Sequence, residues 1–397
     1  MAIRLSPIPN RISRYSRSTK LFISLVLALG LAHNALADSS LGIVNQAIET
    51  GRGLINSENP YDQILGAGIL SDIGDASALA ILETHATGDD IVFQRSAIDT
   101  LIGIQHPAGI DLIYRLASQS ETFTQFLAQS LATNPRDDMG DFLLGVLQES
   151  SPEVQRYAIQ ALAHMKITPN ALGVINKVLD SPESGQTTKA YGYYYLAHRG
   201  LGSEVEQRLL DLITTGDLVD REVVAVALGH LDTSTALEGL IKLEKSSDAR
   251  VALAALSSHA ALGDAQSIEA LSEIIKTGTN LNAEVGASAV RRLQPEVAHA
   301  MSVDLFENNL RPDPGGRLLE SWRAIKWDAT EIYAWGLAHE NDDIKMQTIW
   351  LVGQRQERKM LDTLGKYLGD ENPAIRGMAA WAIVHIAPEE YVPGTKV

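Results

Sequence analysis

The sequence predicts an all-α solenoid, a superhelix of about eleven stacked helix pairs, and three observations lead to this fold class. A short amphipathic helical pattern recurs along the chain at intervals of about 31 residues. Turn residues separate the copies, and no stretch shows the sustained apolar–polar alternation that is typical of a half-buried strand. One such pair is too small to bury its own apolar face, so the pairs must stack and share a core that runs lengthwise.

The clearest copy of the pattern is SPEVQRYAIQALAHM, residues 151–165. Ser151 suits the N-cap of a helix, and Pro152 suits its first position because the missing N–H would have no partner there. The apolar side chains then recur at spacings of three and four and share one helical face: Val154, Ala158, Ala161, Leu162 and Met165.

With Leu162 as an anchor, equivalent helices can be placed along the chain at steps of 27 to 37 residues. The position four residues before the anchor is small in most copies, which predicts close approach of neighbouring helices. Proline caps open several copies, at Asn59-Pro60, Ser151-Pro152, Ser181-Pro182 and Asn372-Pro373. The predicted anchors are Leu70, Leu101, Leu131, Leu162, Leu196, Leu228, Leu256, Leu293, Ile325, Val352 and Ile383.

A second helix follows the first in most copies. After Leu256, for example, Gly263 and Asp264 precede the apolar pattern of residues 267–275. The glycine suits the C′ position of the first helix, and the aspartate suits the turn before the next. Each repeat is therefore predicted to be a helix pair.

Three stretches carry a resemblance to a known family: residues 151–165, residues 248–275 (DARVALAALSSHAALGDAQSIEALSEII) and residues 372–386 (NPAIRGMAAWAIVHI). They resemble HEAT repeats of the short type of about 30 residues, which also occurs in the phycobilisome-lyase HEAT-like group. The resemblance covers residues 59–386 and implies an α-solenoid whose first helices line a concave, partner-binding surface. It is specific for fold and unspecific for biochemical function.

The repeat pattern divides the chain into segments. Residues 38–58 are expected to form an N-terminal capping helix, residues 59–310 a first run of repeats, and residues 317–387 a Trp-rich second run. Residues 311–316 (RPDPGG) are expected to be either a long turn or a hinge. Only the first helix of the last repeat is present before the tail, residues 388–397, so its apolar face is covered by that tail or left for a partner.

Residues 1–37 read as a Sec-type signal peptide. Five basic and no acidic side chains precede an apolar run over Leu21 to Ala32, and Ala35-Leu36-Ala37 is a small-x-small cleavage site. An uncleaved anchor is the alternative, but the run falls short of the ~20 residues that span a bilayer. The mature chain is thus expected to have no membrane span and to be periplasmic or secreted after cleavage behind Ala37.

Composition excludes several classes of function. The chain has no cysteine, which rules out disulfides, thiolate metal sites and Cys nucleophiles. Its net charge is −16, and loss of the basic segment 1–37 leaves −21. Such an acidic chain is not expected to bind nucleic acid or anionic membranes.

No catalytic, metal-binding or cofactor-binding motif stands out. The phosphate-binding loop, the H-E-x-x-H zinc motif and the G-x-S-x-G elbow are all missing. His164 and His385 both lie two residues after an anchor, which indicates a structural slot rather than a ligand set. The sequence therefore predicts neither a catalytic residue, nor a metal, nor a cofactor.

The aromatic residues depart most from the repeat pattern, because all five tryptophans lie within residues 322–381. Trp350 and Trp381 both occupy the position two before the anchor, where earlier copies are mostly polar. Either they form a side-by-side binding strip on the surface, or they pack under the tail or in a local core. The candidate partner-binding residues are Trp350, Trp381, Trp322, Tyr194, Arg323 and Arg291, the two arginines being able to hold a carboxylate or phosphate or to pair with nearby acids.

Three hypotheses for function remain, and none fixes the oligomeric state. The first is a non-catalytic envelope scaffold that binds a protein partner. The second is a module that binds a glycan or another envelope ligand through its Trp and Tyr clusters. The third, a lyase-type enzyme, rests only on the resemblance to the HEAT-like lyase group.

Overall fold

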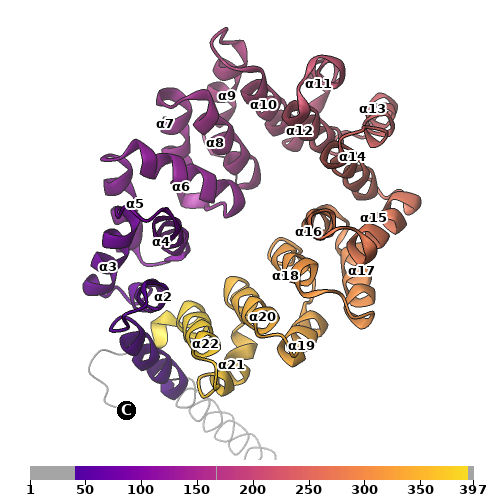
Figure 1. Cartoon of the computed structure of the whole chain (residues 1–397). Helices are drawn as coiled ribbons and strands as arrows, with labels where there is room; N and C mark the ends of the chain where they lie inside the picture. The colour runs from indigo at the N-terminus through magenta and orange to yellow at the C-terminus, as the bar shows by residue number, and fades with distance from the viewer. Residues whose placement is uncertain (1–40, 167, 392–397) are drawn as a thin grey trace, which may run out of the picture.

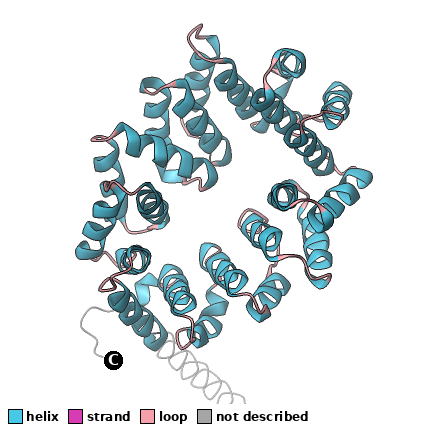
Figure 2. Cartoon of the chain, in the orientation of Figure 1, coloured by secondary structure: helices cyan, strands magenta, loops and turns pink. Residues whose placement is uncertain are grey.

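A computed structural model describes residues 41–166 and 168–391. In that part of the chain the elements are helices and short turns, without a strand (Figure 2). The helices stack in chain order and form a ring two helix layers thick (Figure 1). The all-α solenoid of stacked helix pairs is confirmed.

Eleven inner helices line the centre of the ring in the described part of the chain (Figure 1). They are α2 (Pro60–Ser71), α4 (Ile91–Gly103), α6 (Glu121–Thr133), α8 (Pro152–His164), α10 (Gln186–His198), α12 (Leu218–Leu228), α14 (Ala249–Ala261), α16 (Asn280–Ala289), α18 (Pro312–Ser321), α20 (Asp342–Gln354) and α22 (Pro373–Ile386). These are the helices that carry the anchors, so the anchor-bearing helices line the concave side as the resemblance implied.

The outer helices alternate with the inner ones along the chain. They are the helical residues 41–54 followed by α3 (Ala76–Ala86), α5 (Pro107–Ala117), α7 (Gly140–Glu149), α9 (Ala171–Asp180), α11 (Glu206–Thr215), α13 (Ser234–Glu244), α15 (Ala265–Thr277), α17 (Pro295–Glu307), α19 (Thr330–Ala338) and α21 (Leu361–Tyr367). Short 3₁₀ turns lie at Asp137–Met139, Gly202–Glu204, Val290–Arg292, Arg358–Met360 and Pro388–Glu390.

The inner helices keep a stricter register than the sequence indicated. Their N-caps follow one another at intervals of 30 to 34 residues, and an anchor stands eleven residues after each N-cap, buried in every copy except α14, where it is half-buried. Eight predicted anchors fit this rule. Three are wrong by three residues: the anchors of α14, α16 and α18 are His259, Val290 and Trp322 rather than Leu256, Leu293 and Ile325. In these three copies the sequence pattern placed the anchor on a nearby Leu or Ile, because the residues at the true anchor positions are His, Val and Trp.

The helix caps agree with the sequence in part. The side chains of Asn59 and Asn372 accept hydrogen bonds from the first turns of α2 and α22. Ser151 stands at the N-cap of α8, but its side chain makes no capping bond. Ser181-Pro182 does not open a helix, because α10 begins after Gly185. A first-turn proline and a capping side chain therefore each mark only some of the helix starts.

Small residues let adjacent helices touch. A Cβ on Gly66 of α2 would lie 2.7 Å from the Cβ of Leu54 and 2.8 Å from the carbonyl oxygen of Gly51, so only glycine fits there. Gly263 has a φ of +94°, the left-handed conformation expected for a residue that ends a helix. Both positions support the helix-pair interpretation.

Residues 311–316 are not a break in the solenoid. Arg311 is the N-cap of α18, Pro312 and Pro314 occupy its first turn, and the helix continues through Gly315 and Gly316. Two prolines are compatible with a helix here because both fall within the first turn, where N–H groups have no intrahelical partner. The predicted long turn or hinge is therefore corrected to a helix start.

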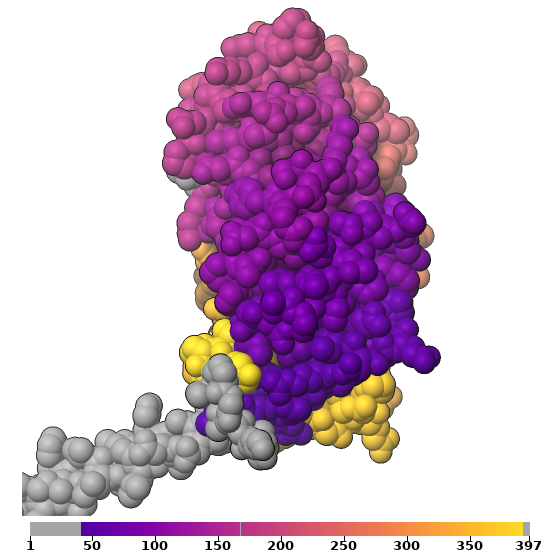
Figure 3. All heavy atoms as spheres, turned by 90° about the vertical axis from the view of Figure 1, so that its left-hand side faces the viewer, coloured from indigo at the N-terminus to yellow at the C-terminus, as the bar shows by residue number. Residues whose placement is uncertain are grey.

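The ring closes where α22 packs beside α2, and we call this contact the closure seam (Figure 1). A Cβ on Gly377 of α22 would lie 2.7 Å from the side chain of Leu65 in α2, and Ile43 from the first outer helix lies against Gly365 of α21. Figure 3 shows the indigo N-terminal residues directly beside the yellow C-terminal ones. Helix 41–54 therefore does not merely cap one end. It supplies the outer neighbour that α22 lacks in sequence.

A buried polar network joins the two ends at the closure seam. The ring Nδ1 of His385 lies 2.9 Å from the carboxylate Oδ2 of Asp72, and its Nε2 lies 3.0 Å from the amide nitrogen of Gln105. The backbone N–H of Gln105 donates to the other carboxylate oxygen of Asp72 at 2.9 Å. His385 is thus satisfied on both ring nitrogens, and the structural slot predicted for it is a link between the ends.

Because the ring closes, the first and last repeats cover each other, whereas the sequence predicted two free ends. In the tail, Tyr391 packs against the core, and its hydroxyl lies 3.4 Å from a guanidinium nitrogen of Arg52. The predicted signal peptide, residues 1–37, and the end of the tail, residues 392–397, lie outside the described residues. A ring of eleven pairs turns by roughly 33° per pair, and this leaves no terminal repeat whose apolar face needs a separate cap.

Candidate functional site

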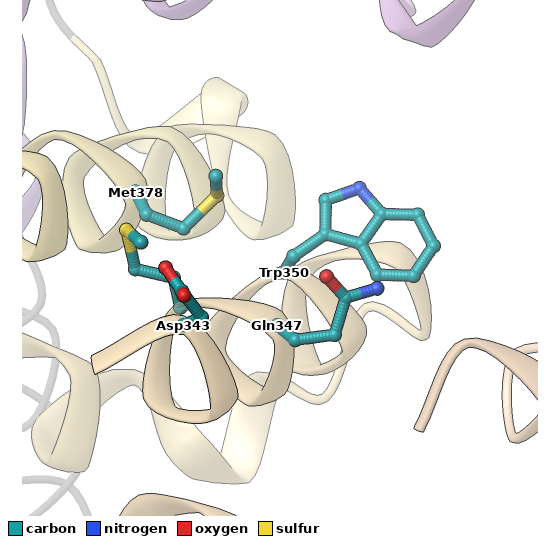
Figure 4. A pocket seen from close by; sticks show the side chains of 5 residues that line it. Asp343, Gln347, Trp350 and Met378 are labelled. Carbon is teal, nitrogen blue, oxygen red and sulfur yellow. The ribbon is translucent and has the colours of Figure 1, made fainter. Parts of the chain in front are cut away.

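The inner surface carries a pocket on α20, which we call the Trp350 pocket (Figure 4). It has a volume of about 270 Å³. The indole of Trp350 points along α20 and away from Met378 of α22, so the pocket is an open hollow rather than an enclosed cavity. Its lining residues are Asp343, Met346, Gln347, Trp350 and Met378.

The spacing of the lining residues explains why the pocket faces the centre of the ring. Asp343, Gln347 and Trp350 recur at intervals of four and three and share one side of α20. The buried residues of α20, among them Thr348 and Val352, lie on the opposite side, against the outer helices. The Trp350 pocket is therefore part of the concave surface.

Trp381 occupies the same repeat position in α22 as Trp350 does in α20, and both are half-buried. Its indole stacks on the ring of His385 at 4.8 Å between centroids and lies over Gly353 of α20. The described residues show no direct ring contact between Trp350 and Trp381. The two lie on neighbouring helices as expected, but Trp381 belongs to the packing of the closure seam, whereas Trp350 lines a pocket.

The prediction that Trp322 belongs to a partner-binding surface is wrong. It is the anchor of α18, its exposure is 0%, and its indole N–H donates to the hydroxyl of Ser302 at 3.0 Å. Trp335 also packs inward, stacked on Phe306 at 3.8 Å. Trp327, which the sequence did not single out, is 40% exposed. The misplaced anchor of α18 is the reason, since it moved Trp322 off its buried position.

Tyr194 is likewise buried rather than free for a partner. Its exposure is 5%, and its hydroxyl lies 3.0 Å from Nε2 of His164 on the preceding inner helix. Burial raises the pKa of Tyr194 to about 12, so the phenol is neutral and can act as a hydrogen-bond donor. Tyr194 thus orients a histidine of the inner surface.

Three histidines stack at the C-terminal ends of successive inner helices, and we call them the histidine row: His164, His198 and His230. Each stands two residues after its anchor, the slot that His385 fills at the closure seam. Nδ1 of His198 lies 3.2 Å from Nε2 of His230. Desolvation, helped by neighbouring positive charge, lowers the pKa of His164 to about 3 and that of His230 to about 4, and it lowers the pKa of His198 as well.

The two candidate arginines lie near this row rather than at the Trp350 pocket. Arg323 donates to the backbone oxygen of Thr133 at 2.5 Å, a bond from the end of α18 across the ring to the end of α6. Arg291 is exposed, and its charge lowers the pKa values of both His164 and Arg323. Both arginines directly follow an anchor, because the anchors of α16 and α18 are Val290 and Trp322. The six predicted residues therefore do not form one site: Tyr194, Arg291 and Arg323 lie by the histidine row, Trp350 and Trp381 lie on α20 and α22, and Trp322 is buried.

The described residues contain neither a metal-binding cluster nor a helix that could span a membrane. Within residues 41–166 and 168–391, no group of three or more His, Cys, Asp or Glu side chains is arranged to hold a metal ion. In the same residues, no helix combines the length and apolar character needed to cross a bilayer.

Comparison with known proteins identifies one part of the chain. No curated protein shows a significant match to the sequence. Residues 331–394 match the family described as HEAT repeats, whose members generally serve as scaffolds for protein–protein interaction. This matched part contains α20, α21 and α22, and therefore the Trp350 pocket. The resemblance drawn from NPAIRGMAAWAIVHI is confirmed by this match to HEAT repeats over residues 331–394.

Proposed function

We propose that this protein is a non-catalytic scaffold of the cell envelope that binds a protein partner on the concave surface of its ring. The observation that carries the proposal is the Trp350 pocket, which lies in the part of the chain that matches HEAT repeats. Tryptophan is a frequent anchor of protein interfaces because it supplies a large contact area at little entropic cost.

The lining of the Trp350 pocket indicates the chemistry of the partner. Met346 and Met378 are flexible apolar side chains that adapt to different shapes, and Trp350 adds a flat aromatic surface. Asp343 places a carboxylate at the same pocket. The pocket therefore suits a peptide segment with a bulky apolar side chain next to a basic one, which also agrees with the net charge of −16.

A photo-crosslinking experiment tests the binding surface. A photoreactive amino acid at Gln347 should give a discrete crosslinked protein in an envelope fraction, while the same label at Arg208 on the outer helix α11 should not. Trp350→Ala should weaken affinity for the crosslinked partner by ~10-fold or more, as expected for a hot-spot residue. Trp327→Ala is the matched control because it removes an exposed tryptophan outside the pocket. Equal losses in both variants, or equal crosslinking at both positions, would refute the proposal.

The envelope location rests on residues 1–37 and needs its own test. When the full chain is produced in a bacterial host, the mature protein should begin at Asp38 and should be released with the periplasmic or secreted fraction. Mass spectrometry of the N-terminus measures this directly. Retention of residues 1–37 in a cytoplasmic protein would contradict the location without affecting the binding proposal.

A further inference from the structure

Three arginines gather at the C-terminal ends of α16 and α18, and we call them the cationic cluster: Arg291, Arg292 and Arg323. In most other inner helices the residue directly after the anchor is small, for example Ala163, Ala197 and Gly229. A long cation at that position does not serve helix packing. The two helices also end early, since α16 and α18 have 10 residues each whereas most inner helices have 13. The ends of these two helices are thus built differently from the rest of the array.

The cluster forms on two neighbouring helices and reaches across the ring to distant repeats. The hydrogen bond from Arg323 to the carbonyl of Thr133 joins residues 190 positions apart. The turn Val290–Arg292 packs against α18, and the charge of Arg291 acts on His164 of α8, on Arg323 of α18 and on its neighbour Arg292. The cationic cluster therefore lies on the concave side, next to the histidine row.

No carboxylate of the described residues forms an ion pair with the cluster, although Glu222 and Glu320 attract Arg292 and Arg323 from a greater distance. In the described part of the chain, none of the three guanidinium groups lies within 4.0 Å of an Asp or Glu oxygen. Arg292 instead contacts the hydroxyls of Ser257 and Ser258, and Arg323 contacts a backbone carbonyl. This is notable in a chain with 49 acidic and 33 basic side chains, where ion pairs are easy to form.

Unpaired guanidinium groups in such a setting are energetically unfavourable. Desolvation lowers the pKa of Arg292 to about 10 and also lowers the pKa of Arg323. An anion placed among the three groups would remove their mutual repulsion and would accept several charge-assisted hydrogen bonds. Guanidinium forks match the two oxygens of a carboxylate or phosphate group, which makes oxyanions the best-fitting class.

We propose that the cationic cluster is a binding site for an oxyanion group, a phosphate or a carboxylate, on the concave side of the ring. Arg291 supplies the free guanidinium, since it is exposed and makes no hydrogen bond within the described residues. Arg292 and Arg323 supply fixed positive charge at the base of the site. Polyanions such as nucleic acid are disfavoured by the net charge of −16, so the ligand is a small anion or a single anionic group.

Calorimetric titration of the mature protein with inorganic phosphate and, separately, with citrate tests the proposal. At least one of the two should bind, and their relative affinities distinguish a phosphate site from a carboxylate site. Arg291→Gln should weaken that binding by about tenfold or more through loss of charge-assisted hydrogen bonds. Arg208→Gln on the outer helix α11 is the matched control, because Arg208 is also exposed, and it should leave the affinity unchanged.

Histidine NMR supplies a second readout on the same samples. A bound anion favours protonated neighbours, so the pKa of His198 should rise when the ligand is added to the wild type and should not rise in Arg291→Gln. The proposal is overturned if neither anion binds, if Arg208→Gln weakens binding as much as Arg291→Gln, or if binding leaves the histidine row unchanged. These outcomes do not depend on the Trp350 pocket, so they are separate from the test of partner binding.

Discussion

The closure seam and the histidine row place histidine in the same repeat slot and give it opposite surroundings. At the seam, His385 on α22 faces Asp72 in the equivalent slot of the next helix around the ring. In the row, His164 faces His198 in that slot, and His198 faces His230. One neighbour is a carboxylate and the others are imidazoles, although the backbone positions are equivalent.

The difference shows that the slot itself does not decide the role of the residue. His385 donates to Asp72 and accepts from Gln105, so a neutral ring satisfies both bonds inside the protein. In the described residues the row has no carboxylate partner, and desolvation, the neighbouring imidazoles and the charge of Arg291 together keep His164 neutral. At the closure seam the histidine in this slot holds two helices together. In the histidine row the histidines leave polar groups available to the interior of the ring.

Removal of the carboxylate at the seam should have the largest effect. Asp72→Ala leaves His385 and the backbone N–H of Gln105 without their acceptor in a buried site, which should cost about 2–4 kcal/mol of unfolding free energy. Urea denaturation measures the loss, and small-angle scattering should show a larger radius of gyration if the ring opens. Asp111→Ala, at an exposed position of α5, is the control and should be neutral. If both variants are equally stable, the seam does not depend on this network.

A second substitution transfers the seam arrangement to the row. His198→Asp places a carboxylate next to His164, whose ring centroid lies 5.3 Å from that of His198. The pKa of His164, about 3 in the wild type, should then rise by more than two pH units, as measured by NMR. An unchanged pKa would mean that Arg199 or Arg291 captures the new carboxylate, and that the neighbouring slot does not control the histidine.

The same variant should change how stability depends on pH. In the wild type the folded-state pKa of His164 lies below its ordinary value of 6.5, so the unfolded chain binds more protons between those values. The contribution of His164 to the free energy of unfolding is therefore fully present above pH 6.5 and is lost as the pH falls toward 3. His198 and His230, whose pKa values are also lowered, act in the same direction. In His198→Asp the loss due to His164 should shrink, which thermal melts between pH 7 and 4 can measure. A steeper loss would contradict the assignment.

The smallest effect is expected at the outer partner of the seam network. Gln105→Ala removes the side-chain bond to Nε2 of His385 but keeps the backbone bond to Asp72, so the cost should be about 0.5–1.5 kcal/mol. Urea denaturation of Gln105→Ala and Asp72→Ala under the same conditions shows which variant loses more unfolding free energy. A loss larger than that of Asp72→Ala would show that the amide, rather than the carboxylate, holds the seam.

The sequence predicted the parts of the fold that depend on nearby residues. Helix pairs, their spacing and the inner position of the anchor-bearing helices follow from caps and apolar periodicity, which act within one or two turns. The anchor errors at Leu256, Leu293 and Ile325 arose where the true anchor is not the most apolar residue nearby. RPDPGG was taken for a break because its prolines signal a turn as strongly as they signal a first helical turn.

The candidate site was predictable only in pieces. Trp350 was found from its repeat position, and Arg291 and Arg323 from their charge in an acidic chain. Burial of Trp322 and Tyr194 could not be read locally, because it depends on the neighbours that face them from other helices. The approach of Arg323 to Thr133 could not be foreseen either, since 190 residues separate them in sequence.

The sequence by itself determined an all-α array with a repeat of about 31 residues, an acidic surface and a basic N-terminal segment. Only the tertiary structure decided that the array closes, that helix 41–54 completes the last pair, and that arginines and histidines from distant repeats meet inside the ring. The physical reason is that small rotations between successive helix pairs accumulate along the array. Each pair adds a small rotation fixed by side-chain packing, and whether eleven rotations return to the start is a property of their sum, which no single repeat encodes.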